Sequence, residues 1–196
     1  LIYQLTPLEI LKLKVFDAFV KPQEASGLFV TLDITEQDVQ EEGGWPFPRQ
    51  ILTEIHMDLL HRGAMGVGYV IAFSEPDRFG GDEDFADVLG LYPSVIAMFE
   101  TNNQKYPQTT GTVILGDDVG GVMLKGSTQN IDILKNNAYQ GISSAPIDVD
   151  GLTRRLPLLM RTPDGWTPAF GIQILKVLAQ ADTYVIKTND NGLEEI

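Results

Sequence analysis

The sequence predicts an α/β fold, with a central sheet of mostly parallel or mixed strands, flanking helices and a β-meander toward the C-terminus. Between residues 28 and 99, short apolar runs alternate with amphipathic helical patterns, which favours parallel strands joined by right-handed crossovers. Near the C-terminus, Asp150-Gly151 and Asp164-Gly165 are turn signals beside short apolar runs, as in a meander. A length of 196 residues favours one domain over residues 1–196.

A helix and a strand open the pattern. Residues 7–19 carry apolar side chains at helical spacing, with Thr6 as the N-cap. Residues 28–34, Leu-Phe-Val-Thr-Leu-Asp-Ile, form a largely apolar run, which is typical of a short strand. Residues 35–40 predict a short acidic helix, which Gly43 ends.

The middle of the chain continues the alternation. Residues 49–61 predict an amphipathic helix, and Gly63 stands just past its end, where a left-handed cap is expected. Residues 67–73 are almost entirely apolar, which predicts a central strand. Asp82 is placed to cap a helix through residue 89, and residues 95–99 predict the third strand.

Residues 101–145 interrupt the alternation. They are rich in Asn, Gln, Thr and Gly, and we interpret them as an excursion of loops and short strands. The remaining predicted elements are strands at residues 112–115, 122–124, 156–160 and 184–187 and a helix at residues 168–179. Asn191-Gly192 predicts a last turn, and we expect its return strand to be cut off, with the chain truncated at the C-terminus.

The charge balance narrows the range of partners. The formal net charge is −13 and the pI about 4.4, which argues against nucleic acid or an anionic membrane surface, because both bind clustered Lys and Arg. Small ligands, cations and proteins remain open as partners. The sequence has no cysteine, so disulfides and thiol chemistry are excluded, and no apolar run reaches the ~20 residues that span a bilayer.

The two histidines do not predict a metal site. His56 and His61 are five residues apart, a spacing that does not place them on one face of a helix, and we expect both to face solvent. No zinc-protease, phosphate-loop or serine-hydrolase motif occurs. No metal, cofactor or catalytic residue is therefore predicted.

One group of candidate ligand-binding residues follows from the predicted strand ends, which share one edge of a parallel sheet where ligands bind. Asp33 lies near the end of the first strand, and Glu75 and Asp77 directly follow the second. Residues 44–49, Gly-Trp-Pro-Phe-Pro-Arg, form a stiff connector that delivers an arginine to the next helix. The group is Asp33, Arg49, Glu75, Asp77 and Asp82. The alternative is that these residues form turns, a rigid connector and a structural ion pair.

A second candidate group surrounds the turn at Asp150. It consists of Asp148, Asp150, Arg154 and Arg155. Neighbouring residues on a strand point to opposite faces, so only one of the two arginines is expected to face a given site. A salt-bridged hairpin is the alternative, and we prefer it for one of them. Trp45 is a further candidate for ligand contact, with packing as its alternative.

The order of these motifs resembles the CHASE2 domain. The matching features are residues 44–49, the Arg-Gly-Ala of residues 62–64, residues 73–77, Gly81-Asp82 followed by Phe85-Ala86, and residues 150–159. The resemblance implies a sensor domain outside the membrane in bacterial receptors, anchored by transmembrane helices of the longer protein. The outputs of such receptors include nucleotide cyclases, histidine kinases, diguanylate cyclases and Ser/Thr kinases. The family commonly has Asp in the second strand where this chain has Val70, which weakens a shared acidic or metal site.

Three functions remain open. The first is a ligand-binding sensor of a nucleotide cyclase or histidine kinase, on the periplasmic face of the bacterial inner membrane. The second is a dimerisation module without a small-molecule ligand, using an apolar face such as that of the first helix. The third is a metal-dependent hydrolase, which needs converging carboxylates. The expected partners are a small-molecule or ionic stimulus, a second copy, and the membrane through the parent's transmembrane helices, with no nucleic acid.

Overall fold

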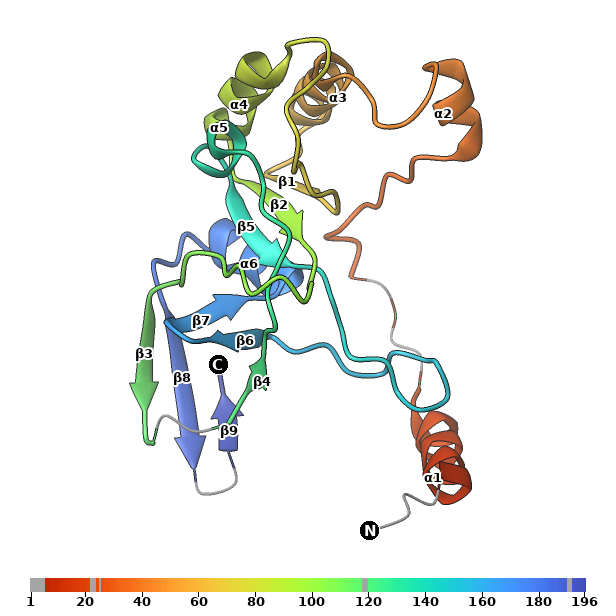
Figure 1. Ribbon diagram of the computed structural model, residues 1–196, viewed down its shortest axis with the longest axis vertical. Coiled ribbons are helices and arrows are strands. Elements are labelled where there is room, and N and C mark those ends of the chain that lie inside the picture. Colours follow the sequence, from red (N-terminus) through yellow and green to blue (C-terminus); the bar gives the residue numbers. More distant parts are fainter. Residues whose placement is uncertain (1–5, 22–23, 25, 118–119, 190–191) are drawn as a thin grey trace. The chain divides into compact units, whose positions relative to one another are not determined.

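The computed structural model describes residues 6–21, 24, 26–117, 120–189 and 192–196 (Figure 1). The chain forms two compact units. The N-terminal unit comprises residues 1–45 and 146–155, and the main unit comprises residues 46–145 and 156–196. The described residues hold six helices and nine strands, which confirms the predicted α/β class. Every helix in this described part is too short or too polar to cross a lipid bilayer.

The N-terminal unit contains two of the predicted helices. These are α1 (Thr6–Phe19) and α2 (Glu36–Glu41). Thr35 caps α2 in a reciprocal arrangement, because its hydroxyl accepts from the Asp38 amide while the Asp38 carboxylate accepts from the Thr35 amide. Such a capping box satisfies two amides that a helix otherwise leaves unpaired.

The strand predicted at residues 28–34 is absent, so that prediction was wrong. The segment has no strand partner among the described residues, and Leu28, Val30 and Leu32 are 82%, 93% and 65% exposed. Propensity for β structure expresses how a residue packs against neighbouring strands. Without such a neighbour among the described residues, the apolar run does not form a strand.

A parallel sheet forms the centre of the main unit. Its strand order is β1 (Val67–Tyr69), β2 (Ser94–Met98) and β5 (Tyr139–Ile142). Every residue of β2 is buried, so β2 is the central strand and the prediction that residues 67–73 are central was wrong. Strand β5 was not predicted, because it is short and contains Gly141. A Cβ on Gly141 would lie 2.6 Å from the Phe170 Cα, so the close approach of the next helix requires glycine.

Helices cover both faces of this sheet. On one face lies α6 (Phe170–Leu178), where a Cβ on Gly68 would lie 2.8 Å from Ile174. The next residue, Tyr69, points to the other face and packs edge-on against Phe85. That face is covered by α3 (Arg49–His61) and α4 (Asp82–Leu91), with α5 (Asp132–Lys135) packed on α4 (Figure 1). Alternation of side chains along a strand thus separates the two helical layers.

Two smaller sheets complete the main unit. One has the order β4 (Val122–Met123), β6 (Leu159–Thr162) and β7 (Gly165–Pro168), and β6 and β7 form the predicted hairpin at Asp164-Gly165. The other has the order β3 (Thr112–Leu115), β8 (Tyr184–Asn189) and β9 (Gly192–Glu195). The meander is confirmed. The last turn's return strand was expected to be cut off, but it is present as β9; Asn191 of that turn lies outside the described residues.

Burial of His56 overturns the expectation that both histidines face solvent. His61 is exposed, whereas His56 is 0% exposed. Its Nδ1 lies 2.9 Å from the Tyr69 hydroxyl and the two rings stack, while Nε2 has no hydrogen-bond partner in the described part of the chain. Position 56 is one turn from buried Leu52, and this spacing indicated the core face of α3. Burial lowers the pKa of His56, because the protonated ring loses its hydration.

We expect mild acid to destabilise the fold through His56. The unfolded chain takes up a proton near the ordinary pKa of about 6.5, whereas the folded chain takes it up only at lower pH. Stability is therefore full above pH ~6.5 and falls below it, by up to ~1.4 kcal/mol per pH unit. Urea unfolding between pH 7.5 and 5 should show a shallower decline for His56→Gln, while His61→Gln keeps the original slope. Identical slopes for all three proteins would contradict this assignment.

Candidate functional site

The connector that precedes α3 is anchored at its end. Pro48 has φ −52° and ψ 142°, the extended geometry that proline favours, and α3 begins directly after it at Arg49. Phe47 is 4% exposed and Arg49 is 6% exposed, so the residues on either side of Pro48 enter the core. The two prolines stiffen the connector, and burial of Phe47 and Arg49 fixes its end. Together they explain why Arg49 has a defined position at the start of α3.

Arg49 is bound within the main unit by three different groups. Its Nε donates to Asp82 Oδ1 at 3.2 Å, and one terminal nitrogen donates to the Glu75 carbonyl oxygen at 3.1 Å. Its guanidinium carbon lies 4.6 Å from the centre of the Phe73 ring. Glu75 thus contributes its backbone and not its carboxylate. An arginine on an aromatic face and beside a carboxylate is strongly stabilised when it is buried.

Two carboxylates complete this arrangement, which we call the Arg49 clasp: Arg49, Asp77 and Asp82. Asp77 Oδ2 accepts from the amides of Arg49 and Gly81 at 3.0 and 3.2 Å, and Asp82 Oδ2 accepts from the Asp77 amide at 2.7 Å. Partial burial would raise the pKa of Asp77, but these amides, that of Phe79 and the Arg49 charge outweigh it and lower the pKa. The clasp therefore ties the first turn of α3 to the first turn of α4.

The role of Asp82 differs from the expected N-cap. Gly81 holds the cap position, and Asp82 is the first residue of α4. Its carboxylate is used by Arg49 and by the Asp77 amide instead of by amides of its own helix. A buried cation within reach outcompetes the local cap, because charge-assisted hydrogen bonds are stronger than neutral ones.

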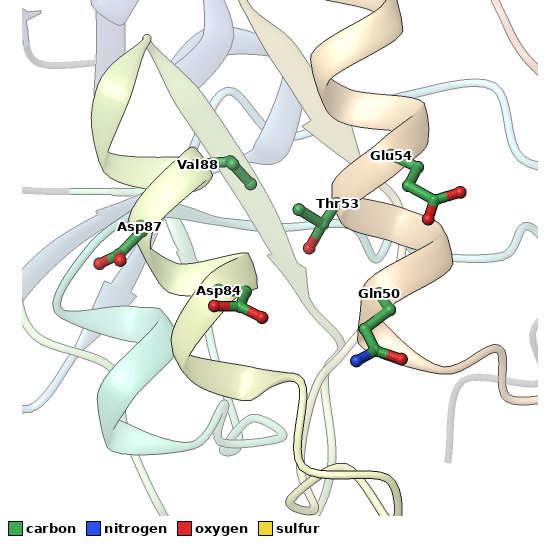
Figure 2. A pocket seen from close by; sticks show the side chains of 6 residues that line it. All are labelled: Gln50, Thr53, Glu54, Asp84, Asp87 and Val88. Atoms are coloured by element: carbon green, nitrogen blue, oxygen red, sulfur yellow. The ribbon is translucent and has the colours of Figure 1, made fainter.

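A groove of about 650 Å³ opens between α3 and α4, and its lining begins at Gln50, directly after Arg49 of the clasp (Figure 2). Its lining residues are Gln50, Thr53 and Glu54 on α3 and Asp84, Asp87 and Val88 on α4. Figure 2 shows Asp84, Thr53 and Val88 directed toward the space between the helices, while Glu54 and Asp87 point outward along its two rims. The floor of the groove therefore combines the polar Thr53 and Asp84 with the apolar Val88, and each rim carries one acidic residue.

The chemistry of the groove favours positive charge. In the described part of the chain, Glu54, Asp84 and Asp87 form no ion pair. Their charges add to a chain whose formal net charge is −13, so the local potential attracts cations. No group of three or more metal-ligating side chains converges among the described residues, so the carboxylates are spread along the groove and not gathered at one point.

The second predicted group forms a cluster around Arg154 in the N-terminal unit. Arg154 Nε and one terminal nitrogen donate to the two oxygens of Asp17 at 2.7 and 2.8 Å. Both terminal nitrogens donate to Asp150, at 2.8 and 2.6 Å, and one also donates to Asp148 at 3.1 Å. All five N–H donors of the guanidinium are used. Hydrogen bonds from Arg154 lower the pKa of Asp150 to about 2 and also lower the pKa of Asp17.

The remaining predicted residues lie outside these two clusters. The Arg155 side chain is 64% exposed, 3.7 Å from Asp148, and stacks over Phe16. Asp33 is exposed, and Trp45 is 47% exposed; both belong to the N-terminal unit. The structure thus brings Arg49, Asp77 and Asp82 together in the main unit, and Arg154 with Asp148 and Asp150 in the N-terminal unit.

Sequence reasoning missed the groove and one member of the Arg154 cluster. The signal for the groove was the pair Asp84 and Asp87, one turn apart on α4, facing the polar side of α3 that begins with Gln50. Asp17 is 137 positions from Arg154, and no local pattern in the sequence joins them.

Comparison with known proteins gives one match. The family model of the CHASE2 domain matches residues 1–193, essentially the whole chain. No curated protein and no solved structure matches the chain.

Proposed function

The chain belongs to the CHASE2 family of extracytoplasmic sensor domains in signalling receptors, and on this premise we propose that it binds a cationic ligand in the α3–α4 groove. A CHASE2 domain is a sensory and not a catalytic domain, so the chemical output belongs to another part of the receptor. We propose a nucleotide cyclase or a histidine kinase as that output, in the bacterial inner membrane. The family is extracytoplasmic, which supports a periplasmic location for this domain.

The groove is the observation that carries this proposal. Its volume of about 650 Å³ lies within the ~300–1,000 Å³ of small-molecule sites. Carboxylates on the floor and on both rims suit an extended organic cation, such as a polyamine, whose charges are several ångströms apart. A compact metal ion requires several oxygens at one point, and the described residues hold no such group.

The Arg49 clasp can couple ligand binding in the groove to a change in the spacing of α3 and α4. Because the clasp joins the first turns of α3 and α4, a ligand between the helices acts on a pair that is fixed at one end. A ligand that prefers one spacing of the helices shifts the population toward that spacing. Arg49, Asp77 and Asp82 thus position the walls of the groove and need not contact the ligand.

The test is thermal unfolding of the domain with spermidine, putrescine, Mg²⁺ or Ca²⁺, at fixed ionic strength and protein concentration. A ligand at ~100 times its Kd should stabilise the fold by ~2.7 kcal/mol, a shift of several degrees in Tm. We expect the shift for a polyamine to be reduced in Asp84→Asn. The matched control is Glu83→Gln, which removes one charge from an exposed neighbour on α4 outside the groove.

The results also separate the alternatives. Equal shifts in both variants would mean that the cation acts through net charge and not in the groove. A flat response, with a Tm that rises with protein concentration, would favour the dimerisation module. A metal-dependent hydrolase conflicts with the sensory character of the family.

A further inference from the structure

We propose that acid is a second stimulus for this domain, and that protonation of His56 opens the second half of α3. CHASE2 domains lie outside the cytoplasm, and histidine is the side chain whose charge ordinarily changes between pH 5 and 8. The proposal goes beyond the cationic ligand of the groove and does not depend on it. It starts from the position of one imidazole ring between α3 and β1.

His56 joins α3 to the parallel sheet. Its ring lies nearly parallel to that of Tyr69 on β1, with 5.9 Å between the ring centres and 2.9 Å between Nδ1 and the Tyr69 hydroxyl oxygen. Tyr69 is held in turn by Phe73 and Phe85, which pack edge-on against it. The imidazole therefore contacts a side chain that is itself fixed in the core.

His56 is also the last buried residue of α3. The buried residues of this helix are Arg49, Leu52 and His56, whereas residues 57–61 are half-buried or exposed. After the helix, Gly63 has a left-handed φ of +94°, and the space beside it is open. The Arg49 clasp holds the first turn of α3, but the second half is attached to the sheet mainly through His56.

Protonation makes this buried position unfavourable for the ring. An imidazolium has two N–H donors, and the Tyr69 oxygen can accept from only one of them. Nε2 has no partner in the described part of the chain, so its N–H would stay buried and unpaired. A buried charge without a partner is costly. The charged ring gains hydration when the second half of α3 moves away from β1.

The charged groups of α3 and β1 do not offset this cost. Arg49 lies two turns earlier on the same face and is itself positively charged. Glu54 and Asp58 are exposed, and at two positions from His56 they lie on other faces of the helix. On β1, burial raises the pKa of Tyr69, so its hydroxyl stays neutral.

The acidic side chains of α4 are placed elsewhere. Asp82 is bound by Arg49. The others are exposed: Glu83, Asp84 and Asp87. None of the ion pairs among the described residues includes His56. A carboxylate paired with the ring would raise its pKa, whereas burial lowers the pKa of His56.

The direction of the response follows from the two states of the ring. In the open state the hydrated imidazole takes up a proton near its ordinary pKa of about 6.5, whereas in the closed state it does so only at lower pH. The closed state is therefore favoured above pH ~6.5, and the population of the open state rises by up to ~10-fold per pH unit below it. A sensor reports a stimulus through such a population shift.

Native-state hydrogen exchange between pH 7.5 and 5, without any ligand, tests the proposal. Half a helix detached from its sheet is marginal in water, so its amides exchange. After correction for the intrinsic pH dependence of exchange, protection of residues 57–61 should fall by up to ~10-fold per pH unit. These amides should exchange faster than that of Ile96, which is 0% exposed in the central strand and reports global unfolding.

Two variants and one titration complete the experiment. His56→Gln should remove the pH dependence of exchange in residues 57–61, and the matched control His61→Gln should keep it. The chain has two histidines, so His61→Gln leaves a single histidine signal in the NMR spectrum. That signal should titrate over the pH range in which the protection falls, and this measurement does not require a substitution at position 56.

Three results would overturn the proposal. Titration of the His56 ring without loss of protection in residues 57–61 would show that the closed fold accepts the charge. Equal protection of residues 57–61 and of Ile96 would mean that acid acts only through global unfolding. The same pH dependence in His56→Gln would assign the response to other groups. Because no ligand is present, none of these results bears on binding in the groove.

Discussion

Arg49→Ala should destabilise the domain by about 3 kcal/mol, because breaking a buried ion pair leaves the other charge uncompensated. The side chains of Arg49 and Asp82 are 8% and 15% exposed, so Asp82 would keep a charge with little hydration. The Glu75 carbonyl oxygen and the Phe73 ring would also lose their partner. Urea unfolding at pH 7 measures the change as a lower midpoint.

The chain offers a matched control for this ion pair. Arg62, which directly follows the last residue of α3, donates to Asp58 of that helix at 2.7 Å, but the two side chains are 74% and 59% exposed. We expect Arg62→Ala to leave the unfolding midpoint nearly unchanged, since solvent already screens that pair. A similar loss in the two variants would refute the structural role of the clasp. If Arg49→Ala unfolds the protein, Arg49→Lys should give a smaller loss, because a point charge replaces the forked contact.

Asn130→Ala should have a comparable effect, a loss of about 3 kcal/mol. Asn130 is 3% exposed, and its Oδ1 accepts from the Phe73 amide at 2.6 Å. Its Nδ2 donates to the Ala97 carbonyl oxygen and to Gln140. One side chain thus joins the segment after β1 to β2 and β5. Its removal leaves buried polar groups unsatisfied, at ~1–3 kcal/mol each.

Asn137→Ala is the control for this second effect. Asn137 is exposed, and its side-chain amide donates to the Ile133 carbonyl oxygen one turn earlier. We expect its removal to change the unfolding midpoint little. Native-state hydrogen exchange adds a second measurement, because the Phe73 amide should lose its protection in Asn130→Ala. Unchanged exchange at Phe73 would show that the bond to Asn130 does not protect that amide.

Local sequence patterns predicted the helices better than the strands. The bounds of α3 agree with the predicted residues 49–61, because apolar spacing, a preceding proline and a glycine after the last turn are all local signals. Strands β2 and β3 were also found from short apolar runs. In contrast, β5 was missed, since Gly141 is set by the approach of Phe170 and not by any preference for strand.

The contacts of the candidate site could not be predicted from local sequence patterns. The sequence placed Arg49 at the start of a helix and Asp77 and Asp82 in the following loop and helix. The contacts of the clasp could not be predicted from the sequence. An arginine at the start of a helix can bind a ligand or join two helices, and the local sequence is the same in both cases. The groove depends on how α3 packs beside α4, and three of its lining residues come from each helix.

Local patterns in the sequence were therefore enough for the α/β class, for five of the six described helices and for the family, since each depends on spacing and order along the chain. Helix α5, in the segment that was predicted to hold loops and short strands, was not predicted. Contacts between segments distant in the sequence determined which residues are buried, which charges are paired and which strands form. Burial of His56 required Tyr69, the Arg154 cluster required Asp17, and the strand expected at residues 28–34 lacked a neighbour. Burial, ion pairing and strand pairing are properties of two partners, and a sequence pattern specifies only one of them.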